Sequence, residues 1–278
     1  MNFSVITPCL NAAAHIEETV ASVSAQSAVR NGAAGLEHIV CDGGSTDGTL
    51  DILRRLEAGQ PQGAQLRVLS GKDAGMYDAL ARGLRLATGD VVAYLNAGDY
   101  FHPHAFAAVR EVLEQVPDCR WLTGFAVDYA ASGTAFRVVL PYRFRRRLHR
   151  CGAYGRLLPF VQQESTFWRR ELLEAVDLER LARLRLAGDY YLWRRFSERA
   201  DLHVIAAQLG GFRHQPGQLS KNLEGYMAEM ESLASPPGLA DRALAFCDRI
   251  LWHAPPRVKK WLNPRTLHLF DHVSGRWT

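Results

Sequence analysis

Four acidic segments of this chain end at places where a carboxylate could act on a bound ligand. They are Cys41-Asp42-Gly43-Gly44-Ser45, Lys72-Asp73-Ala74-Gly75, Asn96-Ala97-Gly98-Asp99 and Ala187-Gly188-Asp189. The first three follow apolar runs that predict buried strands, and the fourth opens a stretch with helical spacing. Open α/β sheets place their ligands at the carboxyl ends of strands, so these aspartates are candidate site residues.

The segment around Asp42 shows what such a turn could do. The apolar run 36–41 predicts a strand, and Gly43 and Gly44 let the backbone approach a ligand closely. Ser45 or Thr46 can cap the helix that follows. A carboxylate at this point disfavours a bare phosphate and suits the hydrogen-bond donors of a base or sugar. An ordinary β–α turn explains the segment equally well when it is taken alone.

The elements that must position these residues alternate along the first half of the chain. Strands are expected within 3–11 and at 36–41, 66–69 and 91–95, and helices at 15–26, 76–87 and 103–116. This alternation predicts a mostly parallel, doubly wound α/β sheet. The second half predicts a hairpin over 125–140 around Ser132-Gly133, and helices near 189–199, 223–233 and 242–253. No GxGxxG follows the first strand, which argues against a dehydrogenase.

Composition limits the classes that remain. The 278 residues are 47% hydrophobic, which is enough to bury a core, and the net charge is only +4. Five cysteines without CxxC spacing predict neither a disulfide framework nor a zinc site, and they fit a reducing compartment. We find no signal peptide, no apolar run of about 18 residues and no nucleic-acid-binding module. A cytoplasmic protein, soluble or bound to a surface, is expected.

Two segments carry a specific resemblance. TPCLNAAAHIEETVASVSAQ followed by IVCDGGSTDGT resembles the start of the family 2 glycosyltransferases, and Asp73–Ala79 with Ala87–Asp90 resembles the bacterial polysaccharide branch of that family. The resemblance implies a GT-A-type domain over 1–235. It also implies inverting transfer of a sugar from a nucleotide diphospho-sugar to a hydroxyl of a glycan acceptor, lipid-linked in some cases, in bacterial surface polysaccharide assembly.

The resemblance also implies donor-binding residues, and these are Pro8, Asn11, Asp42, Ser45, Asp73, Asp78, Arg82, Asn96 and Arg213. From the residues alone, Asp78 and Arg82 are a surface pair one helical turn apart.

A divalent metal, Mn²⁺ or Mg²⁺, is implied at Asp99, because carboxylates suit hard cations that offset the charge of a departing diphosphate. The family usually has further acids here, but this chain has Asn96 and Gly98. His214, in a segment that resembles the closing loop of the family, is the second implied metal ligand. A helix-capping aspartate and a solvated histidine are the ordinary explanations.

Asp189 is the expected general base, which takes the proton of the acceptor hydroxyl. Its position also fits a helix N-cap, and the resemblance of 189–195 to the D-Y-x-L-W-x-R segment of the family favours the base. Gln163 and Trp193 are expected on the acceptor side. Glu164 is out of the family pattern.

The segment 236–278, after Pro236-Pro237-Gly238, is expected as a helical tail that mixes apolar and basic residues. Contact with the inner face of the plasma membrane, packing on the core and a homodimer contact all fit that composition. Two other functions stay open. The reduced acidic motif would suit a non-catalytic nucleotide-sugar-binding scaffold. A nucleotidyltransferase would need a phosphate loop that 7–11 lacks.

Overall fold

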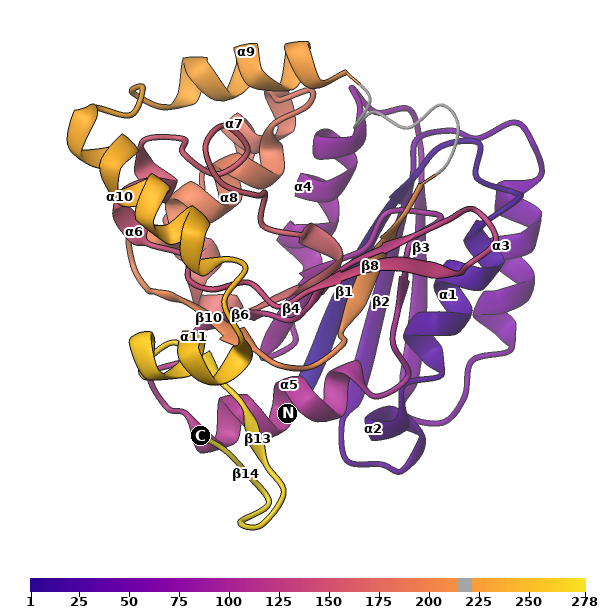
Figure 1. Cartoon of the computed structure of the whole chain (residues 1–278). Helices are drawn as coiled ribbons and strands as arrows, with labels where there is room; N and C mark the ends of the chain where they lie inside the picture. The colour runs from indigo at the N-terminus through magenta and orange to yellow at the C-terminus, as the bar shows by residue number, and fades with distance from the viewer. Residues whose placement is uncertain (215–221) are drawn as a thin grey trace.

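The computed structural model describes residues 1–214 and 222–278, and its centre is a twisted sheet covered by helices on both faces (Figure 1). The strand order of this sheet is β12-β10-β6-β9-β4-β1-β2-β3. Its strands are β1 (Asn2–Cys9), β2 (Gly35–Asp42), β3 (Ala64–Ser70), β4 (Val91–Tyr94), β6 (Trp121–Thr123), β9 (Thr166–Arg169), β10 (Leu202–Ile205) and β12 (Leu267–His268). Among these, β9 alone runs antiparallel to its neighbours. The predicted mostly parallel α/β sheet is confirmed.

A second, smaller sheet has the order β5-β11-β7-β8. It contains β5 (Tyr100–Phe101), β7 (Ala126–Tyr129), β8 (Ala135–Val139) and β11 (Gly210–Arg213). The β7–β8 pair is the hairpin predicted over 125–140, and Gly133 in its turn has a φ of 83°, which favours glycine.

The helices of the first half connect the parallel strands, and those of the second half cover one side of the molecule. They are α1 (Ile16–Ser24), α2 (Ser27–Arg30), α3 (Thr49–Ala58), α4 (Met76–Leu86), α5 (Ala105–Gln115), α6 (Arg146–Arg150), α7 (Leu178–Arg183), α8 (Gly188–Ser197), α9 (Leu223–Leu233), α10 (Leu239–Leu251) and α11 (Pro256–Leu262). Two 3₁₀ turns, η1 (Gln163–Ser165) and η2 (Arg170–Ala175), flank β9.

The core is divided by the main sheet. Strand β1 is buried along almost its whole length, because helices cover both of its faces. On one side Phe3 stacks on Phe106 of α5. On the other side an aromatic cluster joins β6, β9 and α8.

The segment 236–278 differs from the expected helical tail. Helix α10 packs against α6, β12 extends the main sheet beside β10, and β13 (Phe270–Asp271) and β14 (Arg276–Trp277) form a hairpin. Packing on the core is therefore one real role of this segment. Within the described residues, no helix combines the length and the apolarity that crossing a bilayer requires.

Candidate active site

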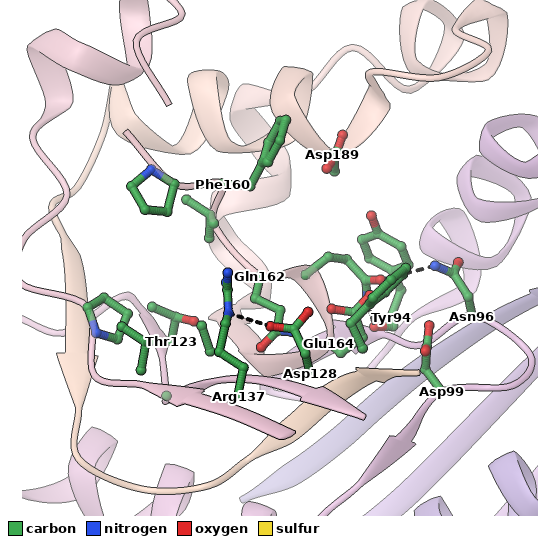
Figure 2. Close-up of a pocket in the computed structure, with 18 of the residues that line it drawn as sticks. Tyr94, Asn96, Asp99, Thr123, Asp128, Arg137, Phe160, Gln162, Glu164 and Asp189 are labelled. Atoms are coloured by element: carbon green, nitrogen blue, oxygen red, sulfur yellow. Dashed lines mark hydrogen bonds and ion pairs between the residues drawn. The ribbon is translucent and has the colours of Figure 1, made fainter. Parts of the chain in front are cut away.

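A cavity of about 660 Å³ opens where the carboxyl end of β4 faces α8, α9 and the β7–β8 hairpin (Figure 2). Four carboxylates line it, and they come from four separate elements of the chain: Asp99, Asp128, Glu164 and Asp189. We call this space the large cavity. Much of the remaining lining is apolar and aromatic, which is typical of a ligand site that excludes water around a few polar groups.

Asp189 lies in the first turn of α8, and two phenols hold its carboxylate. Its Oδ1 accepts a hydrogen bond from the Tyr226 hydroxyl at 3.0 Å and a longer one from the Tyr77 hydroxyl at 3.4 Å, whose proton is shared with the Leu186 carbonyl at 3.0 Å. The backbone N–H of Tyr190 donates to the same oxygen at 2.7 Å. Burial raises the pKa of Asp189 to about 6, and these hydrogen bonds limit the rise. A carboxylate with this pKa is ionised at neutral pH and can still accept a proton.

The turn before α8 is fixed by its neighbours. Glu229 of α9 accepts hydrogen bonds from the backbone N–H groups of residues 185, 186 and 187 at 2.6–2.8 Å. A side chain at Gly188 would collide with the ring of Tyr77. Three helices, α4, α8 and α9, therefore set the position of Asp189.

Asp99 and Glu164 bring two further carboxylates to the large cavity. Asp99 is 3% exposed, and its Oδ1 accepts the backbone N–H of Arg213 at 3.0 Å. Burial raises its pKa to about 7. Glu164 in η1 is 5% exposed, and its carboxylate accepts a hydrogen bond from its own backbone N–H. Burial, and then the negative charge of Asp99, raise the pKa of Glu164 well above its usual range.

Two glutamines beside Glu164 connect the elements around the cavity. Gln163 accepts a hydrogen bond from Asn96 at 3.2 Å and donates to the backbone carbonyl of Tyr94. Gln162 pairs with both backbone groups of Val127 at 2.7 Å. These bonds join η1 to the end of β4 and to the β7–β8 hairpin, so Gln163 lines the cavity and also positions its wall.

The loops that follow β1, β2 and β3 form a second polar region, which we call the β1–β3 edge (8–11, 42–46 and 70–75). The Ser45 hydroxyl accepts the N–H of Asn11 at 2.7 Å, and Asn11 Oδ1 accepts the N–H of Thr46 at 2.9 Å. Asn11 has a φ of 50°, a left-handed conformation that asparagine tolerates. Pro8, near the end of β1, lies beside Cys41.

Asp42 is the best-satisfied carboxylate of this edge. It accepts the N–H groups of Gly44 and Ser45 at 3.1 Å and the Ser70 hydroxyl at 2.8 Å. Burial alone would raise its pKa, but the hydrogen bonds lower it below the usual value.

Beside Asp42 lies a small cavity of about 50 Å³, which Asp73 and Arg82 also line. Asp78 pairs with Arg82 at 2.8 Å. The structure thus brings the predicted donor residues of the first three loops together.

Three predicted site residues lie elsewhere. The Arg213 guanidinium pairs with Glu18 at 2.6–2.7 Å. His214 is exposed, and its Nε2 lies 3.0 Å from Asp128. Trp193 is 3% exposed and packs in the core against Trp121 and Trp168 instead of facing the acceptor side. None of the three lines either cavity in the described part of the chain, and residues 215–220 of the expected closing loop lie outside it.

Comparison with known proteins decides the family, because residues 4–173 match the profile of Glycosyl transferase family 2. The chain belongs to this family. It is 34% identical over 146 residues to an uncharacterized glycosyltransferase of Mycobacterium tuberculosis, a match that covers 52% of each chain. It is 38% identical over 97 residues to a PGL/p-HBAD biosynthesis glycosyltransferase of Mycobacterium bovis, covering 35% of each. The chain spans about half the length, or less, of these relatives.

Solved structures agree on the fold of this family 2 glycosyltransferase. Staphylococcus aureus TarS (residues 1–349) superposes with a TM-score of 0.61 at 17% identity, over 91% of this chain and 72% of TarS. The Pyrobaculum calidifontis mannosyltransferase PcManGT, in complex with GDP-Man and Mn²⁺, gives 0.60 at 20% identity, over 95% and 72%. The Mycobacterium tuberculosis glucosyl-3-phosphoglycerate synthase with Mn²⁺, UDP and phosphoglyceric acid gives 0.55 at 20%, over 86% and 80%. The predicted GT-A fold is confirmed.

Several residues of the candidate site were missed from the sequence. Tyr226 and Glu229 lie one turn apart on α9, and only the structure shows that both reach the start of α8. Tyr77 lies inside a quoted motif, yet its role depends on Gly188, more than a hundred residues away. Glu164 was set aside because it departs from the pattern.

The residues present fit a divalent cation that takes some of its ligands from the protein and the others from the substrate. No three His, Cys, Asp or Glu side chains converge to hold an ion within 1–214 and 222–278. Asp99 and Asn96 both line the large cavity, and Asn96 Oδ1 has no hydrogen-bond partner among the described residues. Hard cations such as Mg²⁺ and Mn²⁺ accept one or two protein oxygens and complete their shell with phosphate and water.

Proposed function

We propose that this family 2 glycosyltransferase moves a sugar from a nucleotide diphospho-sugar to a hydroxyl of a glycan acceptor with inversion at the anomeric carbon. The observation that carries the proposal is the convergence of Asp189, Asp99 and Glu164 on one cavity beside the polar β1–β3 edge. The comparisons support glycosyl transfer in general. The direction of stereochemistry, the acceptor class and the residue roles belong to the proposal.

Asp189 supplies the base. As the acceptor oxygen attacks the anomeric carbon, its proton passes to Asp189, and the bond from the anomeric carbon to the diphosphate oxygen breaks with its electron pair on the departing diphosphate. The pKa of about 6 suits this step, because the carboxylate is ionised near neutral pH and more basic than an ordinary aspartate. Tyr77 and Tyr226 orient it toward the cavity.

The β1–β3 edge binds the nucleoside in this scheme. Asp42 and Asp73 offer carboxylates to the hydrogen-bond donors of base and ribose, while Pro8, Asn11 and Ser45 shape the loop around them. Arg82, held by Asp78, lines the same small cavity.

At the large cavity, Asp99 and Asn96 would hold Mn²⁺ or Mg²⁺. When bound, this cation would offset the negative charge of the diphosphate leaving group. Arg213 contributes its backbone N–H to Asp99. His214 stays a proposed ligand only if it leaves Asp128.

Glu164 lies between Asp99 and Asp189 in the large cavity (Figure 2), which Gln163 also lines, and in this scheme the transferred sugar and the acceptor hydroxyl meet there. A buried carboxylate whose donor is its own backbone N–H is costly, and sugar hydroxyls are donors that could supply further hydrogen bonds. We therefore assign Glu164 to sugar hydroxyls. We propose a bacterial surface glycan as the acceptor, because the sequence resembles the bacterial polysaccharide branch of the family.

Release of nucleoside diphosphate from a panel of nucleotide diphospho-sugars, with Mn²⁺ and simple glycan acceptors, tests the reaction. We expect acceptor-dependent release with one donor and a product of inverted anomeric configuration by NMR. Asp128→Asn is a comparison variant, since it changes a carboxylate of the same cavity that is paired with Arg137 and His214 and leaves the base in place. Donor binding without release under every condition would establish the scaffold instead, and retained configuration would refute Asp189 as base.

A further inference from the structure

Helix α10 has an exposed apolar stripe that its fold does not require. Leu239 is 88% exposed, Phe246 is 65% exposed and Ile250 is 60% exposed. They are spaced seven and four residues apart, so they lie on one side of the helix. Large apolar side chains exposed in a row are uncommon on a soluble surface and mark contact sites.

The other side of the same helix is the one that packs on the protein. Ala245 and Asp248 are buried, Trp252 at the C-cap is buried, and the helix contacts α6. Because this side alone attaches α10 to the core, the exposed stripe adds nothing to that attachment. Helix α11 repeats the pattern with Trp261 at 78% exposure.

The exposed charged side chains of α10, of α11 and of the residues up to 265 have one sign. Arg242, Arg249, Arg257 and Arg265 are all exposed. Between residues 239 and 265 the carboxylates are Asp241 and Asp248, and each is already paired, with Arg147 at 2.5 Å and Arg145 at 2.6 Å. The exposed side chains of α10, of α11 and of the residues up to 265, which we call the α10–α11 face, are therefore apolar and net positive.

We propose that the α10–α11 face docks on an anionic phospholipid surface. Apolar side chains flanked by arginines are the pattern of helices that lie in a membrane interface, where the acyl boundary takes the apolar groups and lipid phosphates attract the cations. A symmetric dimer through this face is disfavoured, because an isologous contact would bring the same arginines of two copies together.

Docking would also place the active site near the lipid. His253, just beyond α10, lines the large cavity together with Trp252, Leu223 and Phe160. Leu223 is 51% exposed and Phe160 is 42% exposed, so part of the cavity wall is an exposed apolar surface. This consequence, unlike the docking itself, rests on the proposed function: the cavity would suit an acceptor glycan attached to a lipid.

Vesicle co-sedimentation of the full chain tests the docking without any activity measurement. We expect binding to vesicles of phosphatidylglycerol mixed with phosphatidylcholine, and little binding to phosphatidylcholine alone. The double variant Phe246→Ser/Ile250→Ser should bind at least about tenfold more weakly, because its apolar anchor is gone. The double variant Arg242→Glu/Arg249→Glu should bind anionic vesicles more weakly, by about fivefold for each arginine that is lost. Added salt should weaken the binding of the wild type.

Phe136→Ser is the matched control, because Phe136 is 61% exposed on β8, away from the α10–α11 face. It should bind the vesicles like the wild type, and melting temperatures should agree across all variants. Failure of the wild type to bind anionic vesicles, or equal binding by Phe246→Ser/Ile250→Ser, would overturn the proposal. A wild-type dimer in light scattering that Phe246→Ser/Ile250→Ser converts to monomer would assign the face to self-association. Since these readouts involve no sugar transfer, their failure leaves the proposed reaction intact.

Discussion

The carboxylates of the β1–β3 edge and those of the large cavity differ in the direction of their pKa shifts. Asp42 receives hydrogen bonds from two backbone N–H groups and a serine, and its pKa is lowered. Asp99 and Glu164 have few donors for their degree of burial, and at Asp189 desolvation outweighs the three hydrogen bonds that its carboxylate accepts, so the pKa values of all three are raised. At Asp42 the hydrogen bonds from its own loops outweigh burial, whereas at the large cavity burial outweighs the hydrogen bonds that the fold supplies.

This difference has an energetic meaning. A carboxylate whose folded pKa is lowered stabilises the protein above its unfolded pKa, and that stability is lost as the pH falls. A carboxylate whose folded pKa is raised costs stability at neutral pH, and the cost disappears in acid. The β1–β3 edge therefore supports the fold and is ready to bind, while the large cavity keeps reactive groups at the expense of stability, as active sites commonly do.

Replacing Asp189 by Asn should give the largest effect and test this contrast directly. Turnover should fall by about 10²–10⁴-fold because the base is gone, while donor affinity should stay near that of the wild type. The variant should also be more stable at pH 7.5 by on the order of 2 kcal/mol, since a pKa of about 6 reflects a penalty on the buried charge. Steady-state kinetics and thermal melts measure the two changes.

The pH dependence of the stability gain shows whether the gain comes from the ionisation of Asp189. Because the unfolded pKa lies near 4 and the folded pKa near 6, the gain of Asp189→Asn should grow between these values and vanish below pH about 4. A variant less stable than the wild type at pH 7.5 would show that the carboxylate is structurally satisfied and would remove the contrast between the two regions.

Replacing Asp42 by Asn should have the next largest effect, with the opposite signature. Donor affinity should weaken by about 10–100-fold, because a charged hydrogen-bond acceptor is lost, while turnover at saturating donor stays close to normal. Stability at neutral pH should fall, and the difference from the wild type should shrink toward acid pH, since the lowered pKa contributes only above its titration. Donor titration by calorimetry and melts over pH 3–8 would measure both; a fall in turnover with unchanged affinity would contradict the assignment.

The sequence predicted the first region well because its contacts are local or lie between adjacent parallel strands. Strands β1 and β2 pair in register from Asn2 with Gly35 to Cys9 with Asp42, so two motifs recognised separately meet at one edge. The expected strands and helices of the first half follow from alternating apolar runs and appear close to their predicted bounds. Strand β12 has only two residues and no such pattern, and its pairing with β10 comes from tertiary packing alone.

The large cavity was predicted only in part, because its contacts connect distant segments. Asp189 was found from its own motif, but Tyr226 reaches it across 37 residues and Tyr77 across 112. Trp193, one helical turn after Asp189, was assigned to the acceptor side, and only the structure shows that it packs in the core against Trp121 and Trp168. Glu164 could have been found only by asking which acidic residue the fold would bury, and the periodicity of the sequence does not answer that question.

Replacing Glu164 by Gln should stabilise the protein by on the order of 1–3 kcal/mol at pH 7.5, because it removes a buried carboxyl group whose raised pKa costs stability above its unfolded pKa. If Glu164 binds sugar hydroxyls, KM for donor or acceptor should rise at the same time. Asp128→Asn is again the control, since Asp128 is paired with Arg137 at 2.7 Å and its loss should bring no gain in stability. Equal melting temperatures for Glu164→Gln and wild type would show that Glu164 carries no penalty.

The smallest predicted effect concerns the donors that Asp189 does have. Tyr226→Phe removes the 3.0 Å hydrogen bond to its ionised form, so the pKa of Asp189 should rise further. The acidic limb of the rate profile, near pH 6 in the wild type, should move upward by about one pH unit or less. Tyr190→Phe is a matched control, because its hydroxyl donates to the His149 carbonyl at 2.9 Å and does not touch Asp189. If both variants shift the limb equally, packing is responsible; if Tyr226→Phe alone shifts it, the hydrogen bond of that phenol tunes the base.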